Sequence, residues 1–336
     1  MPNCIALRLA RRVSCLAIVL LLVLGGSTAA PETFPGTNGP IVFDGVDSTT
    51  RSVQIYRIAA NGTGMTPLTS TTGSVWNECP SFSADGRSIY FDSVDRSQPN
   101  ALEHIYRMNA DGSGRQRVDR RNAPAHACPA AGPGGTKIAA MQYLGQGGSS
   151  IIRMNTNGSG RQILARAQGR QSNYGPTYAP NGRQILFNRV TYAARVGIVR
   201  ADLLISTGPG RARNITASDN APYFTPSWSP DGRTILAVRG MRTATIVQMN
   251  ANGGEVHVLR TVTGGAWVAN PMYSPDGTKI VYFQCEGDCG DPLLPDAGKG
   301  SIWVMNANGS DAKAILTQEA SGVPPASELS WGGAAS

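Results

Sequence analysis

The sequence predicts an all-β protein, a six-bladed β-propeller built from four-stranded antiparallel blades. Two repeated motifs predict this fold. The first is a turn followed by an apolar strand, as in "WSPDGRTILAV" from Trp228 and "YSPDGTKIVYF" from Tyr273. The second is a hairpin, as in "IYRMNADGSG" from Ile105. The turn motif returns at intervals of 45 to 50 residues, and a period of that length is typical of propellers and other repeat arrays.

The spacing between the glycines of the turn motif gives the length of the repeat. Successive glycines are separated by 47, 49, 47, 50 and 45 residues, and they are Gly39, Gly86, Gly135, Gly182, Gly232 and Gly277. The tetrapeptide Ser-Pro-Asp-Gly suits a type I turn, because proline presets φ and the serine and aspartate side chains bond the local backbone. We therefore assign the recurring Asp85, Asp231 and Asp276 to the turns and not to catalysis.

The hairpin motif supplies two further strands to each repeat. Asn-Gly and Asp-Gly provide the positive φ that a tight hairpin requires. The copies from Ile55, Ile105, Ile151, Thr245 and Ile302 follow this pattern, whereas the copy "IVRADL" from Ile198 diverges. Four strands per repeat, arranged radially, bury their faces against neighbouring blades and leave only short edges.

The two ends of the chain predict how the ring closes. The first repeat begins at Gly39 without an inner strand, and the C-terminal "ELSWGG" from Glu328 has the pattern of an inner strand and then stops. We expect this last strand to complete the first blade.

The turn and hairpin patterns resemble the WD40-like repeats of TolB-type six-bladed propellers, over the range from Gly39 to Gly332. The third repeat departs from the pattern, because Ala131 replaces the inner-strand aromatic residue and Gly134 replaces the turn acid. The resemblance implies the propeller fold. TolB itself carries an additional α/β domain before its propeller, and we expect this chain to lack it.

Residues 1–30 have the pattern of a secretory signal peptide. Arg8, Arg11 and Arg12 precede the apolar run Cys15–Leu24, and small residues follow it up to Ala30. The run is shorter than the ~20 residues that a membrane span needs, so we expect cleavage and no stable span, with a retained anchor as the alternative. Residues 31–336 are then a single propeller domain that is periplasmic or secreted.

Charge and composition exclude several classes of function. The formal net charge of +8 becomes +5 once the three signal arginines are removed, and an exported protein is not expected to bind nucleic acid. The three histidines, His104, His126 and His257, lack the spacing of metal ligands. We expect no metal, no cofactor and no catalytic residue, because a nucleophile elbow is also missing from the sequence.

The residues before each inner-strand proline are expected to surround the mouth of the central channel. They mix aromatic, amide and acidic groups, which is typical of a recognition surface; ordinary polar loops are the alternative. The candidates are Trp76, Asn77, Glu78, His126, Asn173, Tyr174, Tyr223, Phe224, Trp267 and Asn270.

The sequence thus favours a monomeric, non-catalytic binding module that recognises a protein or peptide through this mouth. The alternative is a hydrolase or lyase that acts on a polysaccharide or small ligand in the channel. Carboxylates paired across the mouth would favour the enzyme, and a broad apolar and aromatic rim would favour the binding module.

Four cysteines remain after the signal peptide, and an oxidising compartment favours disulfides. Cys79 and Cys128 directly precede the inner-strand proline in consecutive blades, so we predict a bridge between them, with buried free thiols as the alternative. Cys285 and Cys289 lie in one variable loop and are predicted to form a second, small ring.

Overall fold

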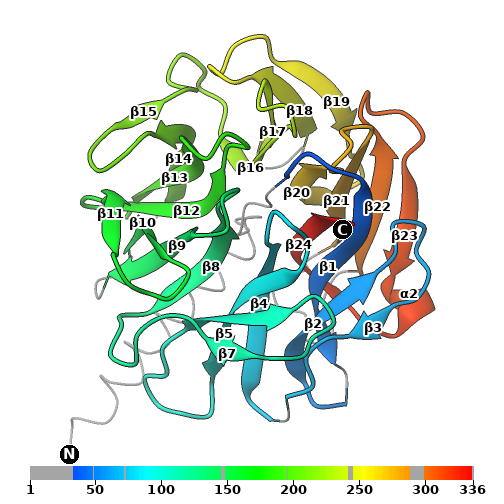
Figure 1. Ribbon diagram of the computed structural model, residues 1–336. Helices are drawn as coiled ribbons and strands as arrows, with labels where there is room; N and C mark the ends of the chain where they lie inside the picture. The colour runs from blue at the N-terminus through cyan, green and yellow to red at the C-terminus, as the bar shows by residue number, and fades with distance from the viewer. Residues whose placement is uncertain are drawn as a thin grey trace, which may run out of the picture.

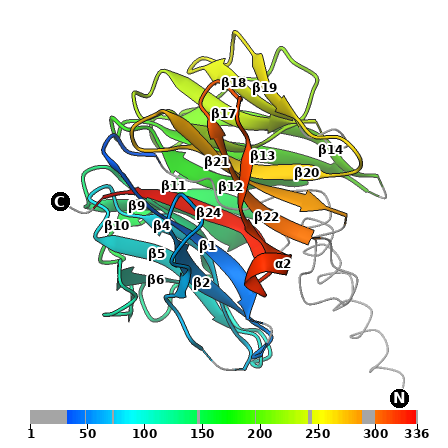
Figure 2. The same cartoon turned by 90° about the vertical axis from the view of Figure 1, so that its right-hand side faces the viewer.

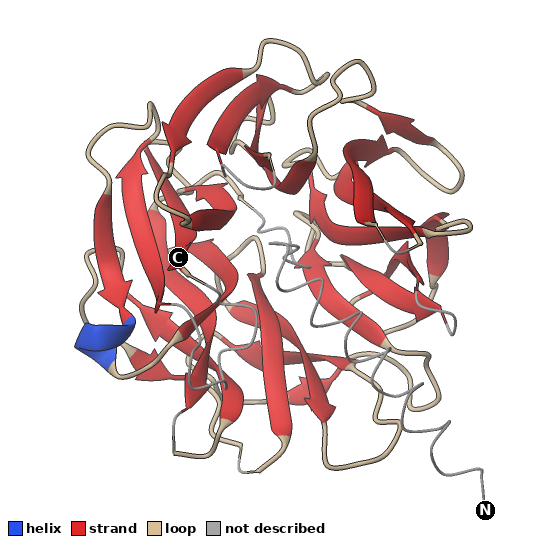
Figure 3. Ribbon diagram, turned by 180° about the vertical axis from the view of Figure 1, so that it is seen from behind, coloured by secondary structure: helices blue, strands red, loops and turns tan. Residues whose placement is uncertain are grey.

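The computed structural model describes residues 33–334 except 48, 72, 145–147, 195, 241–244 and 288–298. The described part of the chain forms six antiparallel sheets of four strands, arranged around a common centre (Figure 1). The predicted six-bladed propeller is therefore confirmed. Strands make up nearly all of the regular secondary structure (Figure 3). The expected signal peptide lies outside the described residues, and within them no helix is long and apolar enough to cross a membrane.

Each blade is a sheet whose strands run in order from the centre to the rim. Blade one comprises β24 (Pro325–Gly333), β1 (Asn38–Asp47), β2 (Ser52–Ile58) and β3 (Thr66–Pro67). Blade two comprises β4 (Val75–Phe82), β5 (Ser88–Asp95), β6 (His104–Asn109) and β7 (Gln116–Arg117). Blade three comprises β8 (His126–Ala131), β9 (Lys137–Leu144), β10 (Gly148–Asn155) and β11 (Gln162–Ala165).

The other three blades have the same order. Blade four comprises β12 (Gln171–Tyr178), β13 (Ile185–Ala193), β14 (Gly197–Ser206) and β15 (Ala212–Asn214). Blade five comprises β16 (Tyr223–Trp228), β17 (Thr234–Arg239), β18 (Thr245–Asn250) and β19 (His257–Thr261). Blade six comprises β20 (Trp267–Tyr273), β21 (Lys279–Glu286), β22 (Lys299–Asn306) and β23 (Lys313–Thr317), and the short helix α2 (Gln318–Ser321) follows it.

The C-terminal strand closes the ring as predicted. β24 pairs antiparallel with β1, so that Trp331 lies opposite Ile41 and Leu329 opposite Phe43. Figure 2 shows this strand beside the first strand of the chain. The indole Nε1 of Trp331 also donates to the carbonyl oxygen of Gly39 at 3.0 Å. The two ends of the propeller are thus joined in one sheet.

The turn aspartates hold their turns, as the sequence indicated. In blade two, Gly86 N–H donates to the Ser83 carbonyl at 2.9 Å, which is the bond of a four-residue turn. Asp85 Oδ1 accepts from Ser83 Oγ at 2.6 Å and from Arg87 N–H at 3.1 Å. The hydrogen bond from Ser83 lowers the pKa of Asp85. Asp231 and Asp276 accept the same pair of bonds in their blades.

The divergent fourth repeat still forms a complete blade. Its "IVRADL" segment belongs to the long strand β14, which continues to Ser206. The hairpin turn lies further along the chain, where Thr207 N–H donates to the Arg211 carbonyl at 3.2 Å. Without an Asn-Gly pair in this segment, the hairpin turn lies later in the sequence, and the blade still has four strands.

Aromatic rings fill the space between neighbouring inner strands. Five blades place a ring at the end of the inner strand, and each ring is at most 3% exposed: Phe82, Tyr178, Trp228, Tyr273 and Trp331. Each ring packs toward the preceding blade. A Cβ atom on Gly332 of blade one would lie 2.7 Å from the Phe82 ring, so only glycine fits there.

The hairpin glycines bring each blade against the rim of the blade before it. Gly112 has φ of 89°, and a Cβ atom there would lie 2.7 Å from the carbonyl oxygen of Leu68 in the preceding blade. A Cβ atom on the equivalent Gly253 would meet the Ile215 carbonyl oxygen at 1.9 Å. Asn-Gly and Asp-Gly therefore serve both the turn and the contact between blades.

Removing the closing strand should destroy the cooperative fold. Deletion of residues 327–336 takes away most of β24 and exposes the apolar edge of β1, so we expect aggregation and loss of a sharp unfolding transition. Calorimetry checks this, and a truncated protein that melts as sharply and as high as the full chain would refute the role of β24.

The hairpin contact predicts a difference between two glycine substitutions. Gly112→Ala combines a positive φ with a backbone clash, so we expect it to lower the free energy of unfolding by about 2 kcal/mol or more. Gly64 also has a positive φ, 67°, but no atom lies within 4 Å of the position that a Cβ atom would take there. Gly64→Ala should therefore cost only about 1 kcal/mol. Equal losses in urea unfolding would show that the contact between blades is unimportant.

Candidate functional site

Six equivalent positions, one in each inner strand, surround the centre of the propeller. We call them the inner ring: Cys79, Cys128, Gly175, Thr225, Asn270 and, by its place in the motif, Glu328. In blades two to six the pairing of the inner strand with its neighbour shifts at this position. An irregularity of this kind is a β-bulge, which bends the strand and re-aims side chains.

The inner ring holds strained backbone. Cys79, Cys128, Thr225 and Asn270 have φ of 55°, 48°, 45° and 49°. Positive φ is uncommon for residues other than glycine and is a genuine outlier for a β-branched residue such as Thr225. Strain of this kind gathers at functional sites.

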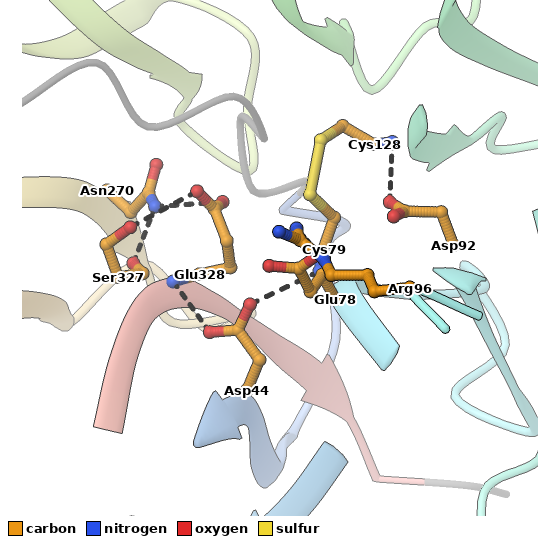
Figure 4. Close-up of a disulfide and its surroundings, with 9 residues drawn as sticks. All are labelled: Asp44, Glu78, Cys79, Asp92, Arg96, Cys128, Asn270, Ser327 and Glu328. Atoms are coloured by element: carbon orange, nitrogen blue, oxygen red, sulfur yellow. Dashed lines mark hydrogen bonds and ion pairs between the residues drawn. A yellow bond between two sulfur atoms is a disulfide. The ribbon is translucent and has the colours of Figure 1, made fainter. Parts of the chain in front are cut away.

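Carboxylates accept the N–H groups that the bulges release from the sheet. Asp44 accepts from Cys79 N–H at 3.4 Å and from Glu328 N–H at 3.0 Å (Figure 4). Asp92 accepts from Cys128 N–H at 2.8 Å. Both aspartates are nearly inaccessible to solvent. They hold the inner strands of blades one, two and three in register at the centre.

The predicted disulfide between Cys79 and Cys128 is present. Their Cα atoms lie 4.9 Å apart and 49 residues separate them in the sequence. Both residues are buried, and the bridge joins the inner strands of blades two and three (Figure 4). Cys285 is buried as well. Its predicted partner Cys289 lies outside the described residues, so that second pair stays a prediction.

Five carboxylates interact electrostatically beside the inner ring. We call Asp44, Glu78, Asp92, Glu103 and Glu328 the acidic cluster. Burial raises the pKa of Asp44 well above its usual value, and Glu328 and Glu78 raise it further. Burial also raises the pKa of Asp92, with Glu78 and Glu103 adding to the effect. For Glu103, burial and then Glu78 raise the pKa to about 7.

Arg96 is the cation that pairs with this cluster among the described residues. Its guanidinium lies 3.5 Å from the Glu78 carboxylate and 3.6 Å from the centre of the Trp76 ring. Burial raises the pKa of Glu78, and Arg96 opposes that rise. Glu78 and Glu103 are the partly exposed members of the cluster, so they are the carboxylates that a further cation can approach.

Most of the predicted mouth residues are buried in contacts between or within blades. Asn77 donates to Gln54 and Thr71 of blade one. His126 lies 3.1 Å from Asp119 of blade two. Less than a tenth of each side chain is exposed for seven of the ten: Asn77, His126, Asn173, Tyr174, Tyr223, Phe224 and Asn270.

Three of the predicted mouth residues are partly exposed: Trp76, Glu78 and Trp267. Trp76 and Glu78 lie at the start of β4, next to Arg96. Trp267 begins β20, and its ring lies 5.4 Å from that of Phe283. These three side chains form the accessible part of the predicted surface, and their role in binding stays a prediction.

The sequence interpretation missed four members of the acidic cluster and Arg96. A signal existed for two of them, since Asp44 and Asp92 occupy the same place in "VFDGV" and "YFDSV". Glu328 also had a signal, because it takes the motif position of Cys79. Arg96 and Glu103 lie in the variable loop after β5, where no repeat indicates their place.

One group of side chains has the spacing of a metal site among the described residues. Ligand atoms of Cys79, Asp92 and Cys128 lie within 4.8 Å of one another. The two sulfur atoms are bonded to each other, so only the Asp92 carboxylate remains as a donor. In its oxidised form this group contains the disulfide that joins the inner strands of blades two and three.

The fold defines a six-bladed β-propeller, with the acidic cluster beside its inner ring. Comparison with known proteins gives the family. The chain matches the TolB β-propeller domain family over residues 21–202, more than half of its 336 residues. The chain belongs to the TolB β-propeller family.

A curated relative is the Tol-Pal system protein TolB of Anaeromyxobacter dehalogenans strain 2CP-C, 26% identical over 218 residues. That match covers 65% of this chain and 44% of the relative, so the alignment spans less than half of the relative's length. Two solved structures share the fold. TolB from Acinetobacter baumannii has a TM-score of 0.64 and 17% identity, with 89% of this chain and 68% of that chain covered. The putative TolB from Agrobacterium tumefaciens has a TM-score of 0.61 and 19% identity, with 87% and 90% covered.

The disulfide should contribute much of the stability at the centre. Replacing Cys79 and Cys128 with serine opens a loop of 49 residues, which the chain-entropy treatment values at about 4 kcal/mol. We expect that loss in the free energy of unfolding, measured with urea. Reducing agent should lower the stability of the unmodified protein and leave the double variant unchanged; a double variant as stable as the oxidised protein would contradict this account.

The raised pKa of Glu103 predicts how stability depends on pH. Between its ordinary value of 4.5 and about 7 the folded protein binds a proton that the unfolded chain lacks. The free energy of unfolding should therefore fall as pH rises through this window. Glu103→Gln should remove this group's part of the slope, and identical pH profiles for the two proteins would show that Glu103 titrates normally.

Proposed function

We propose that this protein is an exported, non-catalytic binding module, and that it recognises a protein partner through a basic segment. The observation that carries the proposal is the acidic cluster beside the partly exposed ring of Trp76. Carboxylates that are buried with too few counter-ions are destabilised, and a cation from a partner relieves this. The partner would place a lysine or arginine against the cluster and apolar groups against Trp76.

The charge distribution supports this choice of partner. The whole chain is basic, with a net charge of +8, so a local excess of acid is a distinct feature of this end of the propeller. Complementary charge guides association and selects partners. An aromatic residue at the edge of the cluster adds the apolar contact that binding hot spots commonly use.

The setting of the protein is part of the proposal. Residues 1–30 have the pattern of a signal peptide, which supports a propeller that acts in the periplasm or outside the cell. The relative's name assigns it to the Tol-Pal system. We extend from this only the general role, an exported propeller that acts by binding another protein.

A pair of peptides tests the proposal directly. The probe is a short flexible peptide that alternates lysine and glycine and carries one leucine, and the matched control replaces each lysine with glutamate. We expect the basic peptide to bind and the glutamate peptide not to bind. The affinity of the basic peptide should fall as the salt concentration increases. Glu78→Gln should weaken binding about tenfold, the usual effect of losing a charged hydrogen bond.

A matched variant controls for general electrostatics. Glu255 lies in the hairpin of blade five, at the other end of the blades, and Glu255→Gln removes the same charge. It should leave peptide affinity unchanged. Equal effects of the two substitutions, or equal binding of both peptides, would refute a specific site at the acidic cluster.

The same carboxylates favour a second candidate, a hydrolase or lyase that acts on a polysaccharide. Glu103, with a pKa of about 7, has the protonation range of a general acid or base. In that case Glu103→Gln would abolish release of reducing ends or unsaturated products from an oligosaccharide panel. Turnover by the unmodified protein, without binding of the basic peptide, would favour the enzyme over the binding module.

A further inference from the structure

One blade lacks the aromatic ring that fills the space between inner strands. In blade three the position belongs to Ala131 in β8, which packs in one apolar cluster with Tyr90 of blade two. Alanine is shorter than the aromatic side chains of the other five blades by a whole ring. Ala131 and Tyr90 are 2% and 4% exposed, so both side chains are buried and any open space begins beside them.

A cavity of about 300 Å³ opens at this place. We call it the Ala131 cleft. Blade two contributes Asp85, Tyr90 and Arg107 to its walls, and blade three contributes Lys137 and a glycine-rich turn. Its volume is at the lower end of the range for small-molecule pockets. It lies at the turn end of the blades, whereas Trp76 and Arg96 lie at the opposite end.

Blade six shows what occupies the equivalent space elsewhere. There the ring of Tyr273 projects toward blade five, and its hydroxyl accepts a hydrogen bond from Gln248 Nε2. Gln248 pairs with Leu236 across the sheet, just as Arg107 pairs with Tyr90 in blade two. Arg107 in blade two therefore has the position that Gln248 has in blade five, where Gln248 contacts the hydroxyl of Tyr273.

Within the described part of the chain, neither cation of the cleft pairs with a carboxylate. The described ion pairs do not include Arg107 or Lys137. Arg107 donates to the Ser88 hydroxyl at 3.0 Å from Nε and 2.8 Å from a terminal nitrogen. Lys137 donates to the Asn155 side-chain oxygen. Asp85, the acid in the wall, is already bonded to Ser83 and Arg87.

We propose that the Ala131 cleft binds a small carboxylate that carries a flat six-membered ring. The ring lies in the cleft beside Ala131 and Tyr90, which line its wall. The carboxylate lies toward Arg107, because a guanidinium bonds both oxygens of a carboxylate in one plane. This site is separate from the acidic cluster and does not depend on the function proposed for it.

Benzoate is the probe for this site, and neutral benzamide is its matched control. We expect saturable benzoate binding by calorimetry and by NMR of the mature protein, and weaker binding of benzamide. Ala131→Phe restores the missing ring and should abolish benzoate binding. Arg107→Gln should weaken it about tenfold, since it removes a charged donor.

Arg57 provides the control substitution. It has the position of Arg107 in blade one, where the facing space is filled by Phe82, so Arg57→Gln should leave benzoate affinity unchanged. Absence of saturable benzoate binding overturns the proposal, as does binding that persists in Ala131→Phe. If Ala131→Phe fails to fold, Arg107→Gln decides the question: unchanged affinity overturns the proposal. Binding of the basic peptide should be unaffected by all three substitutions.

Discussion

Convergence of six inner strands on one axis is the constraint on which the rest of this structure depends. The strands come so close that each must bend, and the bend falls at the inner ring, with positive φ at Cys79, Cys128, Thr225 and Asn270. A bent strand releases N–H groups from its sheet, and buried N–H groups need acceptors. Asp44 and Asp92 meet that need. Carboxylates therefore lie at the centre for structural reasons, and Asp92 lies close enough to Glu78 for the two charges to interact.

The sequence predicted the fold well because each repeat contains short local motifs that specify its turns. A Ser-Pro-Asp-Gly turn and an Asn-Gly hairpin each require particular residues at particular positions, so periodic spacing alone identified the blades. Ring closure followed from the incomplete first and last repeats. The disulfide could be predicted because Cys79 and Cys128 occupy the same motif position in adjacent blades.

The candidate site was harder to predict because it combines residues from blades one and two. The repeat predicted which segments lie near the centre. It did not predict which of their side chains are exposed, because that depends on the direction in which each side chain leaves its strand. Asn77, His126 and Tyr223 point between blades and are buried, whereas Glu78 remains accessible. Arg96 and Glu103 lie in a variable loop, whose path no local pattern specifies. The predicted recognition surface stays a prediction, and of its residues Trp76 and Glu78 lie next to Arg96 at the acidic cluster.

The most direct test of the central claim is the proton balance of peptide binding. Calorimetry of the basic peptide at pH 7, in buffers of different ionisation enthalpy, measures protons released or taken up. A cation that binds beside Glu103 lowers its pKa, which is about 7 in the free protein. The account therefore predicts proton release on binding, and its loss in Glu103→Gln. Binding with no proton release would contradict a role for the acidic cluster, and undiminished release in the variant would exclude Glu103 as its source.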